Sequence, residues 1–277
     1  MPLSKLRLPR PPVSFQLVAL LALILVCLLA AGCIGDTDTP QNTLAPEGEV
    51  ARQQRDLFML AMWPALVVMI LVLGAILVIV LRFRRRKDDA MPKQTHGNPQ
   101  LEIAWTIVPT IIILVFVGIP MLPVIFELGE DPADAYPVNV TGVQWAWLFE
   151  YPEILDSEGQ PVQSKAGELH IPAGRKITLT LRSEDVNHSF GVPRLAGTRD
   201  AIPGEENTYW IKADHPGSFA GQCRELCGTG HAKMRVTVIA LDEQDFEDWS
   251  REMAAGAKRA PGGEDGGAVS AAGSGEQ

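Results

Sequence analysis

Two long apolar runs without charged residues, residues 57–81 and 103–126, constrain the fold of this chain most strongly. At 1.5 Å per helical residue, each run is long enough to cross a hydrocarbon core of about 30 Å. Because lipid offers no hydrogen-bond partners to the backbone, each run is expected to be a helix. Prolines at three positions should kink the second helix, namely Pro109, Pro120 and Pro123. We therefore predict a transmembrane α-helical hairpin over residues 57–128.

The basic cluster "RFRRRK", residues 82–87, directly follows the first run. By the positive-inside rule this cluster is cytoplasmic. The turn of the hairpin is then inside, and the residues before 57 and after 127 are outside.

The N-terminus agrees with this orientation. Basic residues precede an apolar stretch that ends in small residues, which is typical of a secretory signal over residues 1–32. The segment "LLAAGC" resembles a bacterial lipobox and predicts a lipid on Cys33, whereas the alternative is an uncleaved anchor helix. Residues 33–56 are polar and contain prolines, and we expect them to be a flexible outer linker.

Residues 129–249 have a different pattern. Short β-forming segments such as "YPVNVTGVQWAW" and "KMRVTVIAL" alternate with turn sequences such as "DSEGQP" and "DHPGS". This spacing predicts an all-β sandwich or barrel. The segment "DEQDFEDWSREMAAGA" is expected to form a terminal surface helix, and residues 250–277 a disordered, low-complexity tail.

The charge of the chain bears on its partners. The sequence has 33 acidic against 24 basic residues and a net charge of −9, and acidic residues exceed basic ones beyond residue 130. An acidic outer half argues against nucleic acid as a partner. It suits a basic protein partner instead.

The segment "GQCRELCGTGHAKM" carries the chemistry of the outer half. It contains Cys223, Cys227, His231 and Met234, and His188 in "EDVNHSFGVP" offers a second imidazole. Thiolate, imidazole and thioether are soft or borderline ligands that select copper over magnesium or calcium. Two other readings remain open at this point. A disulfide leaves the histidine and methionine unexplained, and a zinc site of two Cys and two His leaves the methionine idle.

The twelve residues from Cys223 to Met234 resemble the binuclear copper (CuA) signature of the cytochrome c oxidase subunit II family. The segments "HGNPQLEIAWTIVPTIII", "QWAWLFEYP" and "FGVPRLAGTRDAIPG" are also similar to that family. The resemblance covers residues 57–249. It implies a helical hairpin followed by an all-β cupredoxin-like Greek-key barrel.

The resemblance also implies a ligand set for two copper ions. Cys223 and Cys227 would both bridge the ions. His188 and Met234 would complete one ion, and His231 would complete the other together with a backbone carbonyl.

Further roles follow from the same resemblance. Glu225 would supply that backbone carbonyl, and its side chain could reach a magnesium ion at the interface with subunit I. Trp145 matches the tryptophan that accepts electrons from cytochrome c. Ala146 stands where the family usually has tyrosine, which puts the detailed electron path in doubt. Glu102 matches the acid that collects protons for a channel into subunit I.

The function implied is electron transfer within a bacterial cell-membrane cytochrome c oxidase. Electrons from cytochrome c would pass through CuA to the haems of subunit I, where oxygen reduction is coupled to proton pumping. No C-x-x-C-H motif occurs in the tail, so the electron donor is expected to be a separate protein. The alternatives are a CuA subunit of a nitric oxide reductase, a quinol oxidase subunit of the same fold, which would lack the copper ligands, and a structural, disulfide-linked lipoprotein.

Overall fold

The computed structural model describes residues 39–84, 94 and 97–256. The expected signal segment 1–32, the lipid site Cys33 and most of the expected tail lie outside the described residues. These three features remain predictions, and mass spectrometry of the mature N-terminus would test the first two.

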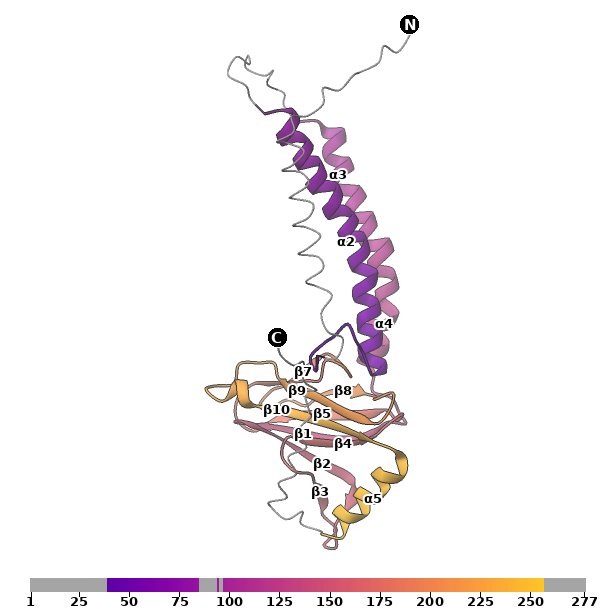
Figure 1. The fold of residues 1–277 in the computed structure, drawn as a ribbon, viewed down its shortest axis with the longest axis vertical. Helices are drawn as coiled ribbons and strands as arrows, with labels where there is room; N and C mark the ends of the chain where they lie inside the picture. The colour runs from indigo at the N-terminus through magenta and orange to yellow at the C-terminus, as the bar shows by residue number, and fades with distance from the viewer. Residues whose placement is uncertain (1–38, 85–93, 95–96, 257–277) are drawn as a thin grey trace, which may run out of the picture. The chain divides into compact units, whose positions relative to one another are not determined.

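Two long helical segments form the predicted hairpin (Figure 1). Helix α2 spans Glu49–Arg82, and the returning segment consists of α3 (Pro99–Ile111), the π-helical turn η1 (Ile112–Gly118) and α4 (Ile119–Gly129). Both segments are long and apolar enough to cross a membrane. The Gln53 side chain on α2 donates a hydrogen bond to the Glu127 carboxylate on α4 over 3.3 Å, so the two segments are antiparallel neighbours.

The three prolines of the returning segment do not end the helix. Pro109 lies inside α3, and the π-helical turn begins three residues later. Proline removes one backbone donor and crowds the carbonyl four residues before it, and a wider π-helical turn is one way to continue a helix past such a site. The structure thus shows a local change in helical pitch after Pro109, and the expected kinks remain a prediction.

Two predicted boundaries need correction. Helix α2 begins at Glu49 rather than at residue 57, so the expected flexible linker 33–56 is wrong for its last residues, where Val50 and Ala51 are buried. Hydropathy marks the start of the apolar span, whereas the helix starts where Gly48 leaves a β-bridge to Ala213. At the other end, α5 (Glu243–Ala254) continues past residue 249 into the region expected to be disordered.

In the part of the chain that the structure describes, ten strands form two five-stranded sheets, as the alternating pattern predicted. The first sheet has the order β3-β2-β1-β5-β8, with the bounds Pro161–Gln163, Ala146–Leu155, Tyr136–Val143, Ile177–Ser183 and Asn207–Ile211. The second has the order β4-β10-β9-β6-β7, with the bounds Glu168–Pro172, Arg235–Leu241, Gly217–Cys223, His188–Gly191 and Thr198–Ala201.

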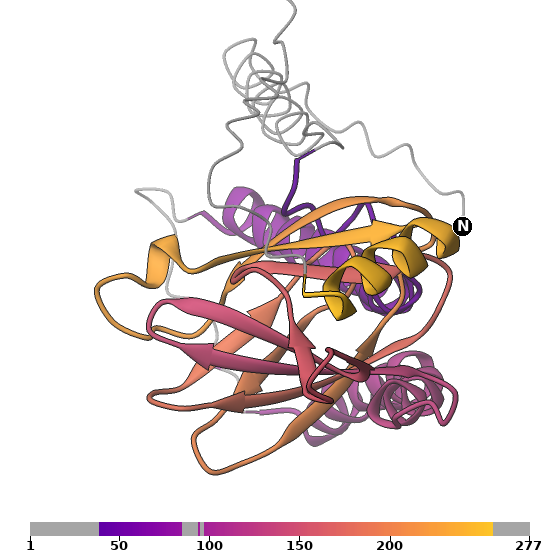
Figure 2. The ribbon, with the colours of Figure 1, turned by 90° about the horizontal axis from the view of Figure 1, so that it is seen from below.

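The sheets are mixed rather than purely antiparallel. Strand β1 pairs in parallel with β5, and β10 pairs in parallel with β4, while the remaining neighbours are antiparallel. Seen from below, the strands lie in two layers with α5 beside them (Figure 2). Alternate residues of β1 are buried, as expected for a strand with one face on a core. The core contains Trp147, Phe149, Leu179 and Phe190, all fully buried.

Candidate metal centre

Three strands of the second sheet hold the predicted metal-binding residues. His188 opens β6, Cys223 ends β9, and Met234 directly precedes β10. Strands β6 and β9 are antiparallel neighbours, with Phe190 opposite Cys223. This ladder brings the histidine next to a cysteine 35 residues later in the chain.

The loop between β9 and β10 supplies the other residues. Its two ends are closed by a hydrogen bond from the Cys223 N–H to the Met234 carbonyl, over 2.9 Å. Within the loop, the His231 N–H donates to the Gly228 carbonyl over 3.1 Å, at the start of the short 3-10 helix η2 (His231–Lys233). Gly228 has φ = 116°, a conformation that favours glycine. Closed in this way, the loop turns Cys227 inward, where its side chain is buried.

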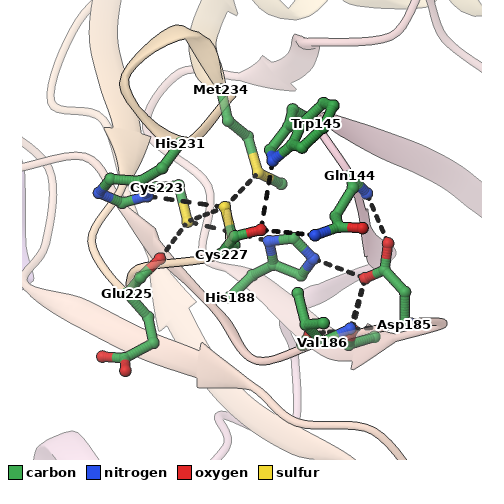
Figure 3. A network of polar contacts seen from close by, with 11 residues as sticks. Gln144, Trp145, Asp185, Val186, His188, Cys223, Glu225, Cys227, His231 and Met234 are labelled. Atoms are coloured by element: carbon green, nitrogen blue, oxygen red, sulfur yellow. Dashed lines mark hydrogen bonds and ion pairs between the residues drawn. The ribbon is translucent and has the colours of Figure 1, made fainter. Parts of the chain in front are cut away.

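The candidate ligand atoms converge on the two sulfur atoms (Figure 3). The Sγ atoms of Cys223 and Cys227 are 3.8 Å apart. His188 Nδ1 lies 3.9 Å from the first sulfur, and His231 Nδ1 and Met234 Sδ lie 3.6 Å and 3.8 Å from the second. All of these side chains are buried except His231, which is half-buried.

The distance between the sulfurs separates the metal reading from the disulfide reading. Both cysteines are free, and 3.8 Å is far longer than a disulfide bond of about 2.05 Å. It is shorter than twice a typical metal–sulfur bond of about 2.3 Å. One metal ion could therefore contact both sulfurs at once, and the two sulfurs could be shared by ions on either side.

The number and type of donors favour copper over zinc. The two sulfurs and the three side chains around them make five side-chain donors, and the Glu225 carbonyl oxygen is a sixth, 3.2 Å from the Cys223 sulfur. A structural zinc ion takes four ligands in a tetrahedron, fewer than this set offers. Thioether sulfur is a soft ligand that suits copper. The residues therefore fit a copper centre with more than one ion.

Asp185 orients His188, a role that the sequence reasoning missed. Its carboxylate lies 2.8 Å from His188 Nε2, which leaves Nδ1 facing the cysteine sulfur. Metal-binding histidines commonly use their second nitrogen in this way. Burial opposes ionisation of Asp185, but hydrogen bonds from His188 and from the N–H groups of Val186 and Gln144 lower its pKa. The spacing of three residues before the histidine was the only signal in the sequence.

The electrostatics of the metal-free site bear on metal binding. Burial, together with the neighbouring Cys223, raises the pKa of Cys227 to about 11. The free thiol is therefore protonated at neutral pH. A metal that binds here as a thiolate complex must displace this proton, and metal binding will release protons.

Trp145 lies directly at the candidate centre, in the turn between β1 and β2. Its indole N–H donates to the Cys227 carbonyl over 3.2 Å, and the Gln144 side chain donates to the same carbonyl over 2.7 Å. The ring packs against Gly230, where a Cβ atom would overlap it. The side chain is nonetheless 42% exposed, so this residue joins the solvent to a cysteine of the site. Ala146 begins β2 and makes no such link.

Two predicted side chains lie away from the sulfurs. The Glu225 side chain is exposed, and only its carbonyl oxygen faces the site. Glu102 lies in the first turn of α3, in the membrane hairpin, four residues after the N-cap Asn98. The structure therefore places Glu102 in the membrane hairpin and the candidate metal ligands in the β domain.

Comparisons with known proteins show the family of this chain. The family model described as "Cytochrome C oxidase subunit II, transmembrane domain" matches residues 41–124, and the model for the periplasmic domain matches residues 136–241. The chain belongs to the cytochrome c oxidase subunit II family. Cytochrome c oxidase subunit 2 of Alkalihalophilus pseudofirmus is 36% identical over 242 residues, which cover 85% of this chain and 68% of that protein. The corresponding protein of Cereibacter sphaeroides is 34% identical over 232 residues, covering 73% and 75%.

This subunit II family also includes proteins with another name. Quinol oxidase subunit 2 of Bacillus cereus is 31% identical over 246 residues, which cover 86% of this chain and 80% of that protein. Overall identity therefore distinguishes the two groups poorly, and the cluster of Cys, His and Met side chains is the more informative feature. The expected architecture is confirmed: this member of the family is a membrane protein with a helical hairpin and a two-sheet β domain on the periplasmic side.

Proposed function

We propose that this chain is the electron-transfer subunit of a cytochrome c oxidase. It would accept electrons from cytochrome c at a binuclear CuA centre and pass them to the haems of subunit I, where oxygen is reduced and protons are pumped. The observation that carries this proposal is the pair of free, buried thiols 3.8 Å apart among two imidazoles, a thioether and a carbonyl oxygen.

In the proposed ligand assignment, both thiolates would be shared by two copper ions. His188 and Met234 would help to hold one ion, and His231 and the carbonyl oxygen of residue 225 would help to hold the other. The convergence of these groups on the two sulfurs supports the set. The pairing of each group with a particular ion rests on the resemblance to the family.

The protein holds the ligand side chains in fixed positions and excludes water from the centre. Bound copper would supply single-electron chemistry. His188 is held by Asp185, and Cys223 is held by the β6–β9 ladder, so these donors move little when charge arrives or leaves. Burial of the cysteines and Met234 keeps water from the sulfurs. Little reorganisation of protein or solvent is then needed for each electron.

Electrons are proposed to arrive through Trp145. Its half-exposed ring and its hydrogen bond to the Cys227 carbonyl support this role. The acidic character of the outer half supports a basic donor such as cytochrome c. Departure toward subunit I requires a partner in the membrane, and the exposed apolar hairpin is the surface available to it.

The test is the spectrum of the purified full-length chain loaded with copper. A purple colour and a seven-line electron paramagnetic resonance signal are expected, with two copper ions per chain. A colourless chain with a Cys223–Cys227 bond would favour the structural lipoprotein, and four-coordinate zinc would refute the copper assignment. A centre found in a complex that reduces nitric oxide but not oxygen would favour the nitric oxide reductase. Turnover with quinol alone would favour the quinol oxidase.

Glu225 is proposed to hold a magnesium ion at the interface with subunit I. Its side chain is exposed while its own carbonyl oxygen lies 3.2 Å from the Cys223 sulfur, which supports this role. In oxidase prepared with manganese, Glu225→Gln should abolish the manganese resonance signal while the copper signal remains. An unchanged manganese signal would remove the residue from the magnesium site.

Glu102 is proposed to collect protons for subunit I. Its position in the first turn of the second membrane segment, at the side expected to be cytoplasmic, supports this role. Glu102→Gln should slow steady-state oxygen reduction several-fold, by roughly 1 kcal/mol in activation free energy, because proton uptake limits turnover. Copper reduction by cytochrome c should keep its wild-type rate. Unchanged turnover would reduce Glu102 to a solvated residue of the helix start.

A further inference from the structure

The residues that lead into α2 are bound to the β domain through their backbone. We name residues 41–52 the N-terminal clamp. At its centre, Gly48 forms an antiparallel bridge with Ala213, in the loop after β8. Four backbone hydrogen bonds join the clamp to the β domain. Two form this bridge, from Glu49 N–H to the Lys212 carbonyl (3.3 Å) and from Asp214 N–H to the Glu47 carbonyl (3.0 Å). The other two run from Glu47 N–H to the Arg194 carbonyl (2.7 Å) and from Ala51 N–H to the Leu195 carbonyl (3.0 Å).

Gly48 is required by close approach rather than by an unusual backbone angle. A Cβ atom at this position would lie 2.6 Å from the Lys212 carbonyl oxygen and 2.8 Å from the Leu195 carbonyl oxygen. Both neighbours are backbone atoms in separate loops of the β domain. Backbone atoms cannot move aside as the end of a flexible side chain could. Any residue larger than glycine would therefore force the two loops apart.

Ion pairs surround this bridge. Arg52 forms a two-pronged pair with Asp214, and Glu49 pairs with Lys212 over 2.8 Å. Arg194 pairs with Glu47 and also donates to the Ala45 carbonyl over 3.3 Å. The Arg52 guanidinium lowers the pKa of Asp214. Partly exposed ion pairs stabilise a fold only slightly, but several in one small area fix which surfaces meet.

The clamp also reaches the loop of the candidate metal centre. The Gln41 side chain donates to the Ala220 carbonyl of β9 over 3.1 Å and accepts a hydrogen bond from Arg224 over 2.5 Å. Arg224 directly follows Cys223. The clamp therefore continues into the start of α2 at its C-terminal end, and at its N-terminal end it contacts the loop between β9 and β10 that holds the candidate metal ligands.

We propose that the N-terminal clamp is a positioning element that holds the metal-bearing β domain in one orientation on membrane helix α2. The inference rests on the proposed function, since a fixed orientation matters if the centre must pass electrons to an acceptor in the membrane. Without the clamp, the described connection from α4 to the β domain would be residues 130–135 and the packing of Leu128 against the β core. Domains joined by a short linker and a small contact move relative to each other by default. Misplacement by about 1 Å can cost roughly a hundredfold in a reaction that depends on geometry.

The experiment uses the assembled oxidase with two single variants. Gly48→Val forces the loops apart, and the milder Arg52→Gln removes one ion pair. The matched controls are Gly129→Val, where nothing lies within 4 Å of the added Cβ, and Arg55→Gln, which pairs only with Asp56 on its own helix. Hydrogen exchange is measured over residues 193–196 and 212–215. Electron transfer from the copper centre to the next acceptor is measured together with the copper spectrum and reduction potential.

Gly48→Val should speed exchange in both segments and slow onward electron transfer, each by about tenfold or more. Arg52→Gln should have a smaller effect of the same sign. The copper spectrum, the reduction potential and both controls should match wild type. Faster exchange with normal onward transfer would overturn the proposal, and so would unchanged exchange or a changed copper spectrum. A wild-type chain without the paired-copper spectrum would instead refute the proposed function, while exchange would still report whether the clamp holds the domain.

Discussion

Replacing Cys223 by serine should abolish the seven-line resonance signal and the purple colour of the copper-loaded chain. A serine oxygen is a hard ligand and cannot share soft copper ions as the thiolate does. The sulfur of Cys223 lies against Cys227, His188 and the carbonyl of residue 225, so its loss removes a contact to most of the set. Electron uptake from cytochrome c should fall by about a hundredfold or more, equivalent to about 2.7 kcal/mol in activation free energy.

Met234→Leu is the matched comparison for this result. The two side chains are similar in size, and thioether bonds to copper are weak, so the paired signal should remain with a shifted reduction potential. Circular dichroism should show both variants folded, because serine is also close in size to cysteine. A seven-line signal that survives Cys223→Ser would rule out a bridging role for this residue.

Trp145→Gln should lower the rate of electron transfer from cytochrome c to copper by about tenfold or more, or about 1.4 kcal/mol in activation free energy. The indole ring of Trp145 is exposed to solvent and is also hydrogen-bonded to the Cys227 carbonyl. Glutamine is smaller than tryptophan and offers cytochrome c, the electron donor, no aromatic surface to contact. The apparent affinity for cytochrome c and its dependence on salt should change little, because no charge is removed.

Two variants separate this effect from docking. Trp105→Phe changes another exposed tryptophan, located in α3, and should leave transfer at the wild-type rate. Glu184→Gln removes an exposed acid next to Asp185, and should weaken binding and flatten its salt response while the bound-state rate is retained. Stopped-flow kinetics at several ionic strengths would measure all three. Wild-type transfer in Trp145→Gln would place electron uptake elsewhere, and Ala146 would be the first position to examine.

The sequence by itself determined the membrane hairpin, the two-sheet outer domain and the chemical type of the metal ligands. The apolar runs predict membrane helices because a bilayer requires a minimum apolar length, and α2 and α3–α4 contain them. Alternation with a period of two predicts a half-buried strand, as β1 confirms. Cys, His and Met in one short segment indicate soft-metal chemistry wherever the segment lies.

Tertiary structure decided which distant groups meet. Asp185 was not predicted because its role depends on how His188 turns once β6 is paired with β9. The start of α2 was predicted too late because Glu49 and Ala51 are hydrogen-bonded to the carbonyls of Lys212 and Leu195, far along the chain. Local patterns report burial and ligand chemistry, since those depend on neighbouring residues. Hydrogen-bond and ion-pair partners more than a hundred residues apart are fixed only when the two sheets close and the chain before the membrane helix docks against them.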